Sequence, residues 1–454
     1  MSNPMVLYFE NVSIEDVSTW ISNFRTRNKL TIDQFHGLDK ICSKYECGPS
    51  GINVGIFLNT FQNRLDRFRK LSRDEKNPDV IFLFMGAKDT MIYNAFKYEC
   101  DVNLGVRSQV VILNEFWLRT STFSPRYDEA MLNILLKLNK KMGGMNLELR
   151  ETPLYGPLER KKGLTIGSRG IMIFGADVTH PGEHVGHSIA AIVATVDDRL
   201  STYAARVRIQ HPHQEIIHET QAMVAELVSA FLARNPGQIV DNVYFFRDGV
   251  GNDQMSEVLY KEIPAIFQGL RDGGAEANVK LVHLVAVKRH HTRFRDMNVN
   301  GTGEIQPGTV VNMLPISPHQ TSFYMCSHLH PSKAPNPNAS SSYKSGVCRT
   351  TLYHVLVDQK GVSLPSLQTM MYHLCYTYER GNRNLSVVPA IHYAHLACTR
   401  GRSHYQERTR LNEDFRGSLP VGVNPPEWGQ PYPETVTFTK LSVNETLRDS
   451  MYYL

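Results

Sequence analysis

Two aspartates stand directly after apolar segments, where their carboxylates could act together on one substrate. Asp177 follows the run Ile171–Ala176, and Asp248 follows Tyr244–Arg247. In α/β folds, the loops at the carboxyl ends of sheet strands commonly carry the chemistry. If the two strands are neighbours, a divalent cation would relieve the repulsion between the carboxylates, and hard oxygen ligands suit Mg²⁺ or Mn²⁺. Two such ions about 3.5–4 Å apart can activate water and stabilise the leaving oxygen in phosphodiester hydrolysis.

A second set of residues has the types that bind phosphate and stack on a nucleic-acid base. Tyr93 and Lys97 are four residues apart in a predicted helix, as are Lys137 and Lys141, so each pair lies on one helix face. Gln109 lies in the strand predicted between those helices. Three ammonium groups converging near a helix start would bind an anion strongly, and an aromatic ring beside them could stack on a base.

Both patterns also have a plain structural explanation. A single aspartate after a strand most often caps a turn, and lysines on amphipathic helices are most often solvated. For the two aspartates together, the catalytic and the structural interpretation both stay open. For the lysines, the pattern by itself favours a solvated surface.

The elements that would carry the second set predict a doubly wound α/β domain that ends near residue 145. The predicted strands and helices, in the order strand, helix, strand, helix, are Asp79–Met85, Thr90–Tyr98, Arg107–Leu113 and Tyr127–Met142. The first three form a βαβ unit, which implies parallel pairing with a right-handed crossover. The apolar stripe of the last helix consists of Met131, Leu135, Leu138 and Met142. The polar side chains on its other face are Asn133, Lys137, Lys140 and Lys141.

A connector over residues 146–168 and a second α/β domain from residue 169 follow. The second domain is predicted in the order βββαβαβ, over Ile171–Ala176, Ser188–Val196, Thr202–Gln210, His218–Ala233, Asn242–Phe246, Asp253–Leu270 and Val279–Val287. The connections between the first three strands are too short for crossover helices, which favours antiparallel pairing. The stretches 331–346 and 419–433 are rich in proline and are expected to be loops.

Composition narrows the class of protein. The chain has 454 residues, with 49 Lys and Arg against 44 Asp and Glu, a formal charge of +5 and a pI near 8.7, which permits a polyanionic partner. No apolar run reaches the roughly 20 residues of a membrane-spanning helix, and the start lacks the pattern of a secretory signal. Seven scattered cysteines without a C-x-x-C pair argue against a disulfide framework and a zinc ribbon, so we expect an intracellular, reducing compartment.

Four motifs together give the chain a specific resemblance to a known family. They are Gly-Ala-Asp-Val-Thr-His-Pro at 175–181, Phe-Arg-Asp-Gly-Val at 246–250, Lys-Arg-His-His-Thr-Arg at 288–293 and His-Tyr-Ala-His-Leu at 392–396. In this combination they resemble the PIWI domain of eukaryotic Argonaute proteins, over residues 165–411, and the first domain resembles the family's MID domain. The resemblance implies an α/β protein with a Rossmann-like, doubly wound MID domain over 1–145 and an RNase H-like PIWI domain over 169–454. Together these form a MID–PIWI lobe without the amino-terminal and PAZ domains of a full Argonaute, and a fungal quelling-type Argonaute is the expected subgroup.

The resemblance implies a catalytic tetrad. Asp177 and Asp248 match its two strand-end aspartates, and His395 matches its fourth member, a neutral imidazole that can coordinate a metal. Glu215, in the context Gln-Glu-Ile-Ile, matches the glutamate that completes the shell of metal-bound water. By itself, a glutamate near a helix start is most often a surface residue that complements the helix dipole. The implied cofactor is Mg²⁺ or Mn²⁺, held by Asp177, Asp248 and His395.

The resemblance also implies a pocket for the 5′-phosphorylated first nucleotide of a guide RNA. Tyr93 would stack on the base, and the phosphate would be held by Lys97, Gln109, Lys137, Lys141 and Arg400. The residues that match family contacts to the guide backbone are Lys288, Arg289, Arg349, Arg380 and Ser386. His392 replaces a family tyrosine at one further backbone contact.

The sequence therefore predicts a small-RNA-guided silencing protein, a guide-dependent endoribonuclease that cleaves complementary target RNA. We expect an intracellular monomer, in the cytoplasm with the nucleus as the open alternative, without a membrane partner and with silencing-complex proteins as further partners. Two other functions stay open: a guide-binding silencing module that does not cleave, and a nuclease of the same fold that acts on structured RNA without a guide.

Overall fold

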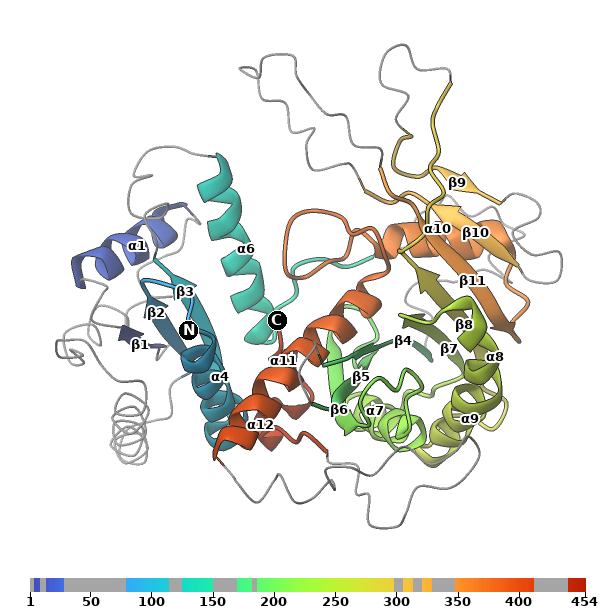
Figure 1. The fold of residues 1–454 in the computed structure, drawn as a ribbon, viewed down its shortest axis with the longest axis horizontal. Helices are drawn as coiled ribbons and strands as arrows, with labels where there is room; N and C mark the ends of the chain where they lie inside the picture. Colours follow the sequence, from blue (N-terminus) through green and yellow to red (C-terminus); the bar gives the residue numbers. More distant parts are fainter. Residues whose placement is uncertain are drawn as a thin grey trace.

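The structure, a computed structural model, describes residues 4–8, 14–27, 79–113, 125–149, 170–181, 186–297, 305–312, 321–328, 348–411 and 440–454. These residues form two α/β halves, each built around its own sheet (Figure 1). The long helix α11 (Pro389–Leu411) and the last residues of the chain lie between the halves.

The first half is built on a parallel three-stranded sheet in the order β1–β2–β3. Its strands are β1 (Pro4–Tyr8), β2 (Val80–Met85) and β3 (Arg107–Ile112). The middle strand, β2, is buried at every position, as expected of a strand covered on both faces. The helices of this half are α1 (Ile14–Arg27), α4 (Thr90–Tyr98), its π-helical continuation η2 (Glu99–Leu104) and α6 (Pro125–Lys141).

Helices cover both faces of this sheet, which confirms the predicted doubly wound arrangement. Helices α1 and α6 pack on one face, where the Trp20 and Phe84 rings lie edge to face at 5.3 Å. Helix α4 packs on the other face through Phe96. It begins where predicted, because the Asp89 side chain accepts a hydrogen bond from the backbone N–H of Ile92 (3.0 Å) and caps the first turn.

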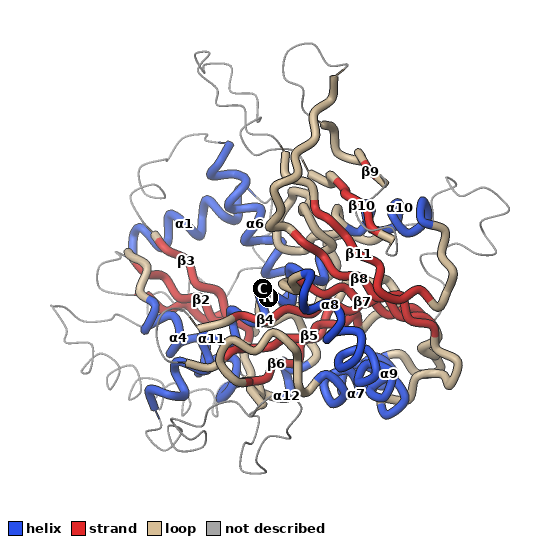
Figure 2. The backbone as a smooth tube through the Cα atoms, turned by 45° about the vertical axis from the view of Figure 1, so that its right-hand side comes forward, coloured by secondary structure: helices blue, strands red, loops and turns tan. Residues whose placement is uncertain are grey.

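The second half is built on an eight-stranded sheet in the order β6–β5–β4–β7–β8–β11–β10–β9 (Figure 2). The predicted antiparallel run of three strands is confirmed in β4 (Ile171–Thr179), β5 (Ser188–Thr195) and β6 (Tyr203–Gln210). Parallel pairing then joins β4, β7 (Asn242–Asp248) and β8 (Lys280–Val287). The strands of this half that the sequence did not predict are β9 (Val310–Val311), β10 (Ser322–Met325) and β11 (Thr351–Asp358), and in the first half β1 was not predicted either.

Helices cover both faces of the larger sheet as well. One face is covered by α7 (Thr220–Arg234), α8 (Met255–Glu257) and α9 (Ile263–Asp272). The helix predicted over 253–270 is interrupted, because a π-helical turn, η4 (Val258–Glu262), separates α8 from α9. The opposite face carries α10 (Leu364–Leu374) and α11, and the short helix α12 (Glu445–Arg448) lies near the C-terminus.

Helix α11 crosses the sheet at very short range beside β4. A Cβ atom on Gly175 would lie 2.2 Å from the backbone oxygen of Ala390, so only glycine fits at this crossing. The close approach brings the first two turns of α11 against the part of β4 that carries Asp177.

Polar contacts tie the two halves together. Asn94 Nδ2 donates to Gln406 Oε1 (2.8 Å), and Lys140 Nζ lies 3.4 Å from Glu379 Oε1 in a pair with fully buried side chains. The solvated surface that the lysine pattern favoured is wrong for Lys97 and Lys141, because each is only 2% exposed, and Lys140 is equally buried. This face of α6 packs against protein, so its charges must find partners there.

Some of the segments predicted from the sequence lie outside the described residues. The loops predicted at 331–346 and 419–433, and most of the connector 146–168, lie outside them. The domain division at 1–145, 146–168 and 169–454 stays a prediction. Within the described residues, no helix has the length and apolar character needed to cross a lipid bilayer.

Candidate active site and phosphate pocket

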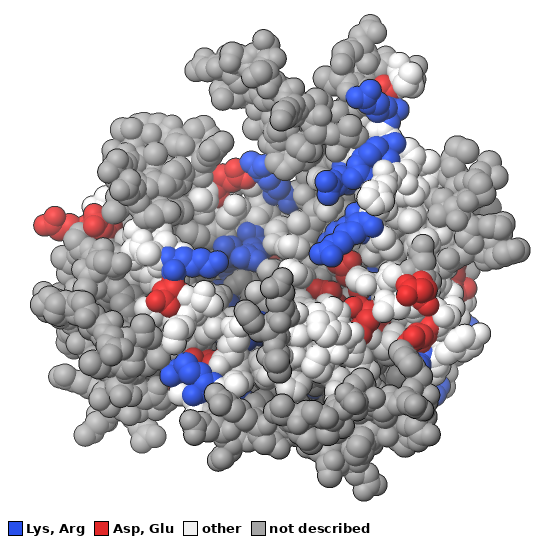
Figure 3. All heavy atoms as spheres, viewed as in Figure 1, with Lys and Arg blue, Asp and Glu red and all other residues white. Residues whose placement is uncertain are grey.

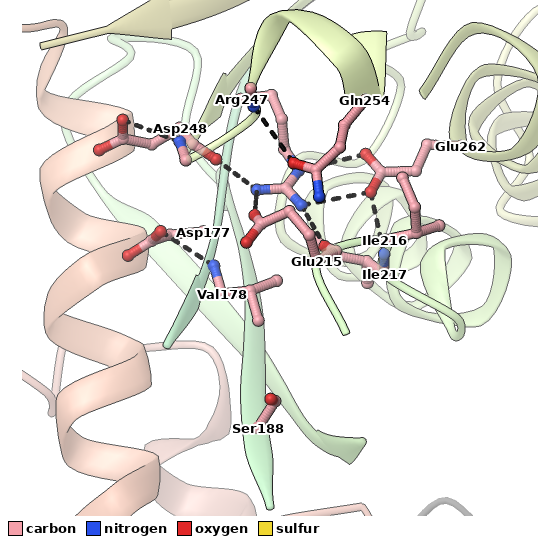
Figure 4. Close-up of polar contacts among 12 residues, drawn as sticks. Asp177, Val178, Ser188, Glu215, Ile216, Ile217, Arg247, Asp248, Gln254 and Glu262 are labelled. Atoms are coloured by element: carbon pink, nitrogen blue, oxygen red, sulfur yellow. Dashed lines mark hydrogen bonds and ion pairs between the residues drawn. The ribbon is translucent and has the colours of Figure 1, made fainter. Parts of the chain in front are cut away.

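Parallel pairing of β4 with β7 places the two predicted catalytic aspartates side by side. Ala176 is the register partner of Arg247, so Asp177 and Asp248, each one residue further on, reach the same edge of the sheet. Strand β4 runs two residues beyond Asp177, whereas Asp248 is the last residue of β7. Figure 4 shows both carboxylates pointing to the same side, toward a long helix.

Helix α11 adds His395, the third predicted member. His395 Nδ1 lies 3.1 Å from Asp177 Oδ2, and this hydrogen bond raises the pKa of His395 above its ordinary value. Asp248 has a different neighbour, since Lys288 Nζ lies 3.4 Å from its Oδ2. Burial raises the pKa of Asp248, Lys288 opposes the rise, and the negative charge of Asp177 adds to it.

Glu215 belongs to the same site. Its Oε1 lies 3.0 Å from Arg247 Nη1 and its Oε2 lies 2.9 Å from His180 Nε2. A Cβ atom on Gly249 would lie 3.0 Å from Glu215 Oε1 and 3.8 Å from Asp177 Oδ1, so both carboxylates border this glycine. The interpretation of Glu215 as a surface residue is wrong, because its side chain is only 10% exposed and is ion-paired.

The fully buried side chain of Arg247 holds this arrangement together (Figure 4). Its Nε lies 3.2 Å from Glu262 Oε2, and its other nitrogens donate to the backbone carbonyls of Glu215 and Asp248. Glu262 also accepts a hydrogen bond from the backbone N–H of Ile217 (2.9 Å). Burial opposes the charge of Arg247, but Glu262 and Glu215 outweigh it and raise the pKa of the guanidinium. One side chain thus joins β7, η4 and the segment before α7.

The donors at this site suit a divalent cation, although they do not form a complete coordination shell. Asp177, Asp248 and Glu215 offer hard oxygen ligands, and His395 offers an imidazole nitrogen. The raised pKa of Asp248 reflects burial and crowded carboxylates, which a bound cation would relieve. In the described part of the chain, however, no three His, Cys, Asp or Glu side chains are grouped so that they could hold a metal ion. The acids are instead paired with Arg247, Lys288 and imidazoles.

Lysines converge beside β3 in the first half, as predicted for an anion pocket. Lys97 Nζ and Lys141 Nζ both donate to the backbone carbonyl of Ser108, at 3.0 and 2.8 Å. Lys141 Nζ also lies 3.3 Å from Gln109 Oε1. Lys137 is near enough for its charge to lower the pKa of Lys141. The predicted phosphate ligands of the first half therefore lie together.

Burial and mutual repulsion lower the pKa values of these lysines. Burial is the largest cause in each case, and neighbouring positive charges add to it. The pKa of Lys97 falls to about 8, that of Lys137 also to about 8, and that of Lys141 well below its ordinary value. An anion in the pocket would relieve this repulsion, so the electrostatics favour a negatively charged ligand.

Arg400 reaches this pocket from α11. Its Nη2 lies 3.4 Å from the Tyr93 hydroxyl, and its Nη1 bonds to Asp101 Oδ2 and lies 3.4 Å from the backbone oxygen of Tyr452. His404 Nε2 lies 3.1 Å from the same oxygen of Asp101. Burial opposes ionisation of Asp101, but Arg400 and His404 outweigh it and hold the pKa of the carboxyl below its usual range. The second half thus supplies a guanidinium to a pocket of the first.

The residues matched to guide-backbone contacts are all at least partly exposed: Lys288, Arg289, Arg349, Arg380 and Ser386. The charge of Arg380 contributes to the lowered pKa of Lys137, so Arg380 lies near the lysines of the first half. On the face seen in Figure 3, lysine and arginine side chains gather in a band across the middle of the molecule, between the two halves. Such a band is the kind of surface that a nucleic-acid backbone follows.

Sequence reasoning missed His180, Arg247, Asp101 and His404, which the structure places in these sites. His180 lies in the motif at 175–181 and Arg247 in the motif at 246–250, so both residues could have been identified from the motifs. Asp101 follows Lys97 by four residues, and His404 follows Arg400 by four. A search for ionisable residues at this helical spacing could have found both.

Comparisons with known proteins agree with this geometry. The Piwi domain family matches residues 80–406. A curated relative, protein argonaute 1A of Oryza sativa subsp. japonica, is 33% identical over 353 residues, which cover 73% of this chain and 30% of the relative. The chain thus spans about a third of the length of the curated relatives that it matches.

Solved structures share the fold. Kluyveromyces polysporus Argonaute with a guide RNA superposes with a TM-score of 0.72 at 21% identity, covering 100% of this chain and 48% of that one. The N. crassa QDE-2 AGO MID–PIWI domains superpose with a TM-score of 0.56 at 20% identity, covering 100% of this chain and 98% of that one. The predicted α/β fold with an RNase H-like second half is therefore confirmed.

We expect Arg247→Met to destabilise the protein strongly. The substitution leaves Glu262 and Glu215 buried without their counter-charge, and breaking a buried pair in this way costs about 3–5 kcal/mol. Denaturant unfolding measures the change in the free energy of unfolding. The matched control is Arg199→Met: Arg199 is 58% exposed and pairs with Glu148 at 3.3 Å. Loss of this surface pair should cost about 1 kcal/mol or less, and equal losses in both variants would contradict the bridging role of Arg247.

Proposed function

This chain belongs to the Piwi domain family, and we propose that it anchors the 5′-phosphorylated end of a short guide RNA and cleaves RNA paired with that guide. The observation that carries the proposal is the convergence of three buried positive charges, those of Lys97, Lys141 and Arg400. The same helix that supplies Arg400 presents His395 to Asp177. Helix α11 would therefore contribute one residue to guide anchoring and another to cleavage.

A terminal phosphate suits the pocket better than an internal one. Lys97 and Lys141 are each only 2% exposed, so a ligand reaches them only with a group at its tip. A terminal phosphate carries more than one negative charge near neutral pH, whereas an internal phosphodiester carries one. Tyr93, beside Arg400, offers a ring on which the first base would stack.

For cleavage, the chain's own residues position the reacting groups. Asp177, Asp248 and His395 would hold Mg²⁺ or Mn²⁺, and these ions supply activated water and charge neutralisation when bound. Arg247 fixes the Glu215 carboxylate, and Gly249 borders the carboxylates of both Glu215 and Asp177. The expected products end in a 3′ hydroxyl and a 5′ phosphate.

The second candidate is a guide-binding silencing protein that does not cleave. It is favoured by one observation, that the described acidic and imidazole side chains do not group into a metal site. The docked position of Glu215 favours cleavage instead. The finer assignments, to a fungal quelling-type subgroup, to the cytoplasm, to a monomer and to silencing-complex partners, stay predictions.

We expect the protein to bind a short RNA with a 5′ phosphate at least about tenfold more tightly than the same RNA with a 5′ hydroxyl. A hydrogen bond to a charged group contributes about 1.5–3 kcal/mol, and 1.4 kcal/mol is a factor of ten. Fluorescence anisotropy with RNA labelled at its 3′ end measures both affinities. Lys137→Met should weaken binding of the phosphorylated RNA about tenfold. Lys261→Met, at a lysine 46% exposed on η4, should leave it unchanged. Equal affinity for both RNAs would overturn the proposal and favour an unguided nuclease.

We expect the preference for the 5′ phosphate to shrink as the pH rises from about 7 to about 9. Lys97 and Lys137, with pKa values of about 8, carry their charge below that pH and lose it above. A bound phosphate favours the protonated lysines, so binding is coupled to proton uptake. The affinity therefore falls as the pH rises. Titrations at several pH values should show the decline for the phosphorylated RNA and a smaller one for the hydroxyl RNA. A flat profile for the phosphorylated RNA would contradict a lysine pocket.

We expect Asp177→Ala and Asp248→Ala each to lower guided cleavage at least about 100-fold, because each removes a carboxylate that would hold the divalent cation. Guide affinity should stay within about twofold, since neither residue lies in the phosphate pocket. A radiolabelled target with guide and Mg²⁺ measures cleavage. The control is Asp272→Ala, at the exposed end of α9. Unaltered cleavage by Asp177→Ala would refute the assignment, and guide binding without any cleavage by the unmodified protein would favour the second candidate.

A further inference from the structure

Two buried cysteine side chains face each other in a place that the proposed function does not use. The Sγ atoms of Cys326 and Cys348 lie 3.3 Å apart, and the two residues are 0% and 2% exposed. Both are free thiols, packed with Ile305 and Phe294. Two thiols in direct contact can react with each other, which a single buried thiol cannot do.

The backbone already holds the two cysteines at one end of a strand pair. Strands β10 and β11 are antiparallel neighbours, and their pairing ends with Met325 opposite Thr351. Cys326 directly follows Met325, and Cys348 precedes Thr351 by three residues. An S–S bond is about 2.05 Å long, so the sulfur atoms need to move by little more than 1 Å to form one.

The surroundings offer acceptors for the thiol protons. The backbone carbonyl of His328 lies within hydrogen-bonding reach of both thiols, 3.2 Å from Cys348 Sγ and 3.5 Å from Cys326 Sγ, and His328 Nε2 lies 3.8 Å from Cys348 Sγ. The hydrogen bond from Cys348 lowers the pKa of Cys326, while the same contact raises the pKa of Cys348. Cys326 is therefore the thiol that ionises first and attacks. His328 and Phe294, which border the pair, are partly exposed.

We propose that Cys326 and Cys348 form a reversible intramolecular disulfide when the protein meets hydrogen peroxide. The Cys326 thiolate attacks a peroxide oxygen: an S–O bond forms, the O–O bond breaks, and the leaving hydroxide takes up a proton to give water. Cys348 then attacks the sulfenic sulfur: the S–S bond forms, the S–O bond breaks, and a second water leaves with the Cys348 proton. The thiol pair loses two electrons and the peroxide gains two.

The consequence of this disulfide for RNA binding rests on the proposed function. Arg349, matched to a guide-backbone contact, directly follows Cys348. The Ser327 hydroxyl donates to the Leu385 carbonyl (2.6 Å), and the Thr351 hydroxyl donates to the Ser386 carbonyl (2.7 Å). A disulfide between the two strand ends therefore restricts the motion of the backbone that carries Arg349 and of Thr351, which contacts Ser386. Stiffening contact residues in advance lowers the entropy lost on binding, so the oxidised protein should bind phosphorylated RNA about two- to tenfold more tightly.

The test is a peroxide titration of the full reduced chain followed by mapping of its thiols. After treatment, the remaining thiols are alkylated, and mass spectrometry of a digest should show peptides cross-linked through Cys326 and Cys348. Dithiothreitol should reverse the cross-link. Cys326→Ser and Cys348→Ser should each abolish it, while Cys375→Ser, at a buried free cysteine after α10, is the matched control and should retain it.

Absence of this cross-link while peroxide oxidises other thiols of the chain would overturn the proposal. Zinc retained by the reduced protein and lost in Cys326→Ser would also overturn it, because the thiols would then serve as metal ligands. RNA binding is read separately, so the two proposals can fail independently. A disulfide without phosphate-dependent RNA binding refutes the proposed function alone, and unchanged RNA affinity after full oxidation refutes only the effect on binding.

Discussion

The candidate active site depends on one buried positive charge, that of Arg247. A guanidinium taken out of water is tolerated only when opposite charge and acceptors surround it, and Glu262, Glu215 and two backbone carbonyls do so. These partners come from β7, η4 and the segment before α7, so the network fixes where those parts meet. The position of Glu215 beside Asp177 thus follows from the electrostatics of the core.

The two candidate sites carry opposite charge, and burial acts on both. In the phosphate pocket it lowers the pKa values of Lys97 and Lys141, and at the strand edge it raises that of Asp248. In each place the charged form is disfavoured until a ligand of opposite sign arrives. A protein that only had to fold would gain stability by replacing such groups. Their presence agrees with one site for an anion and another for cations.

Much of the fold could be predicted because its signals are local. An apolar run marks β2, and the Asp89 cap marks the start of α4. Strand β9 has only two residues, too few for a periodic pattern, so it was missed. The motifs supplied the site residues themselves, but not their partners. The burial of Lys140 depends on Glu379, and the pairing of Arg400 depends on Asp101, each far along the chain, and no local pattern encodes such contacts.

Helix α11 serves both candidate sites. His395 contacts Asp177, and Arg400, five residues later, contacts Tyr93 and Asp101 in the other half. Five residues advance a helix by about 7.5 Å and leave the two side chains about 140° apart around its axis. Because a helix is stiff over this length, a slide or rotation that adjusts one of these side chains must displace the other. A ligand that shifts Arg400 would therefore also shift His395 relative to Asp177, so the two candidate sites are mechanically coupled through α11.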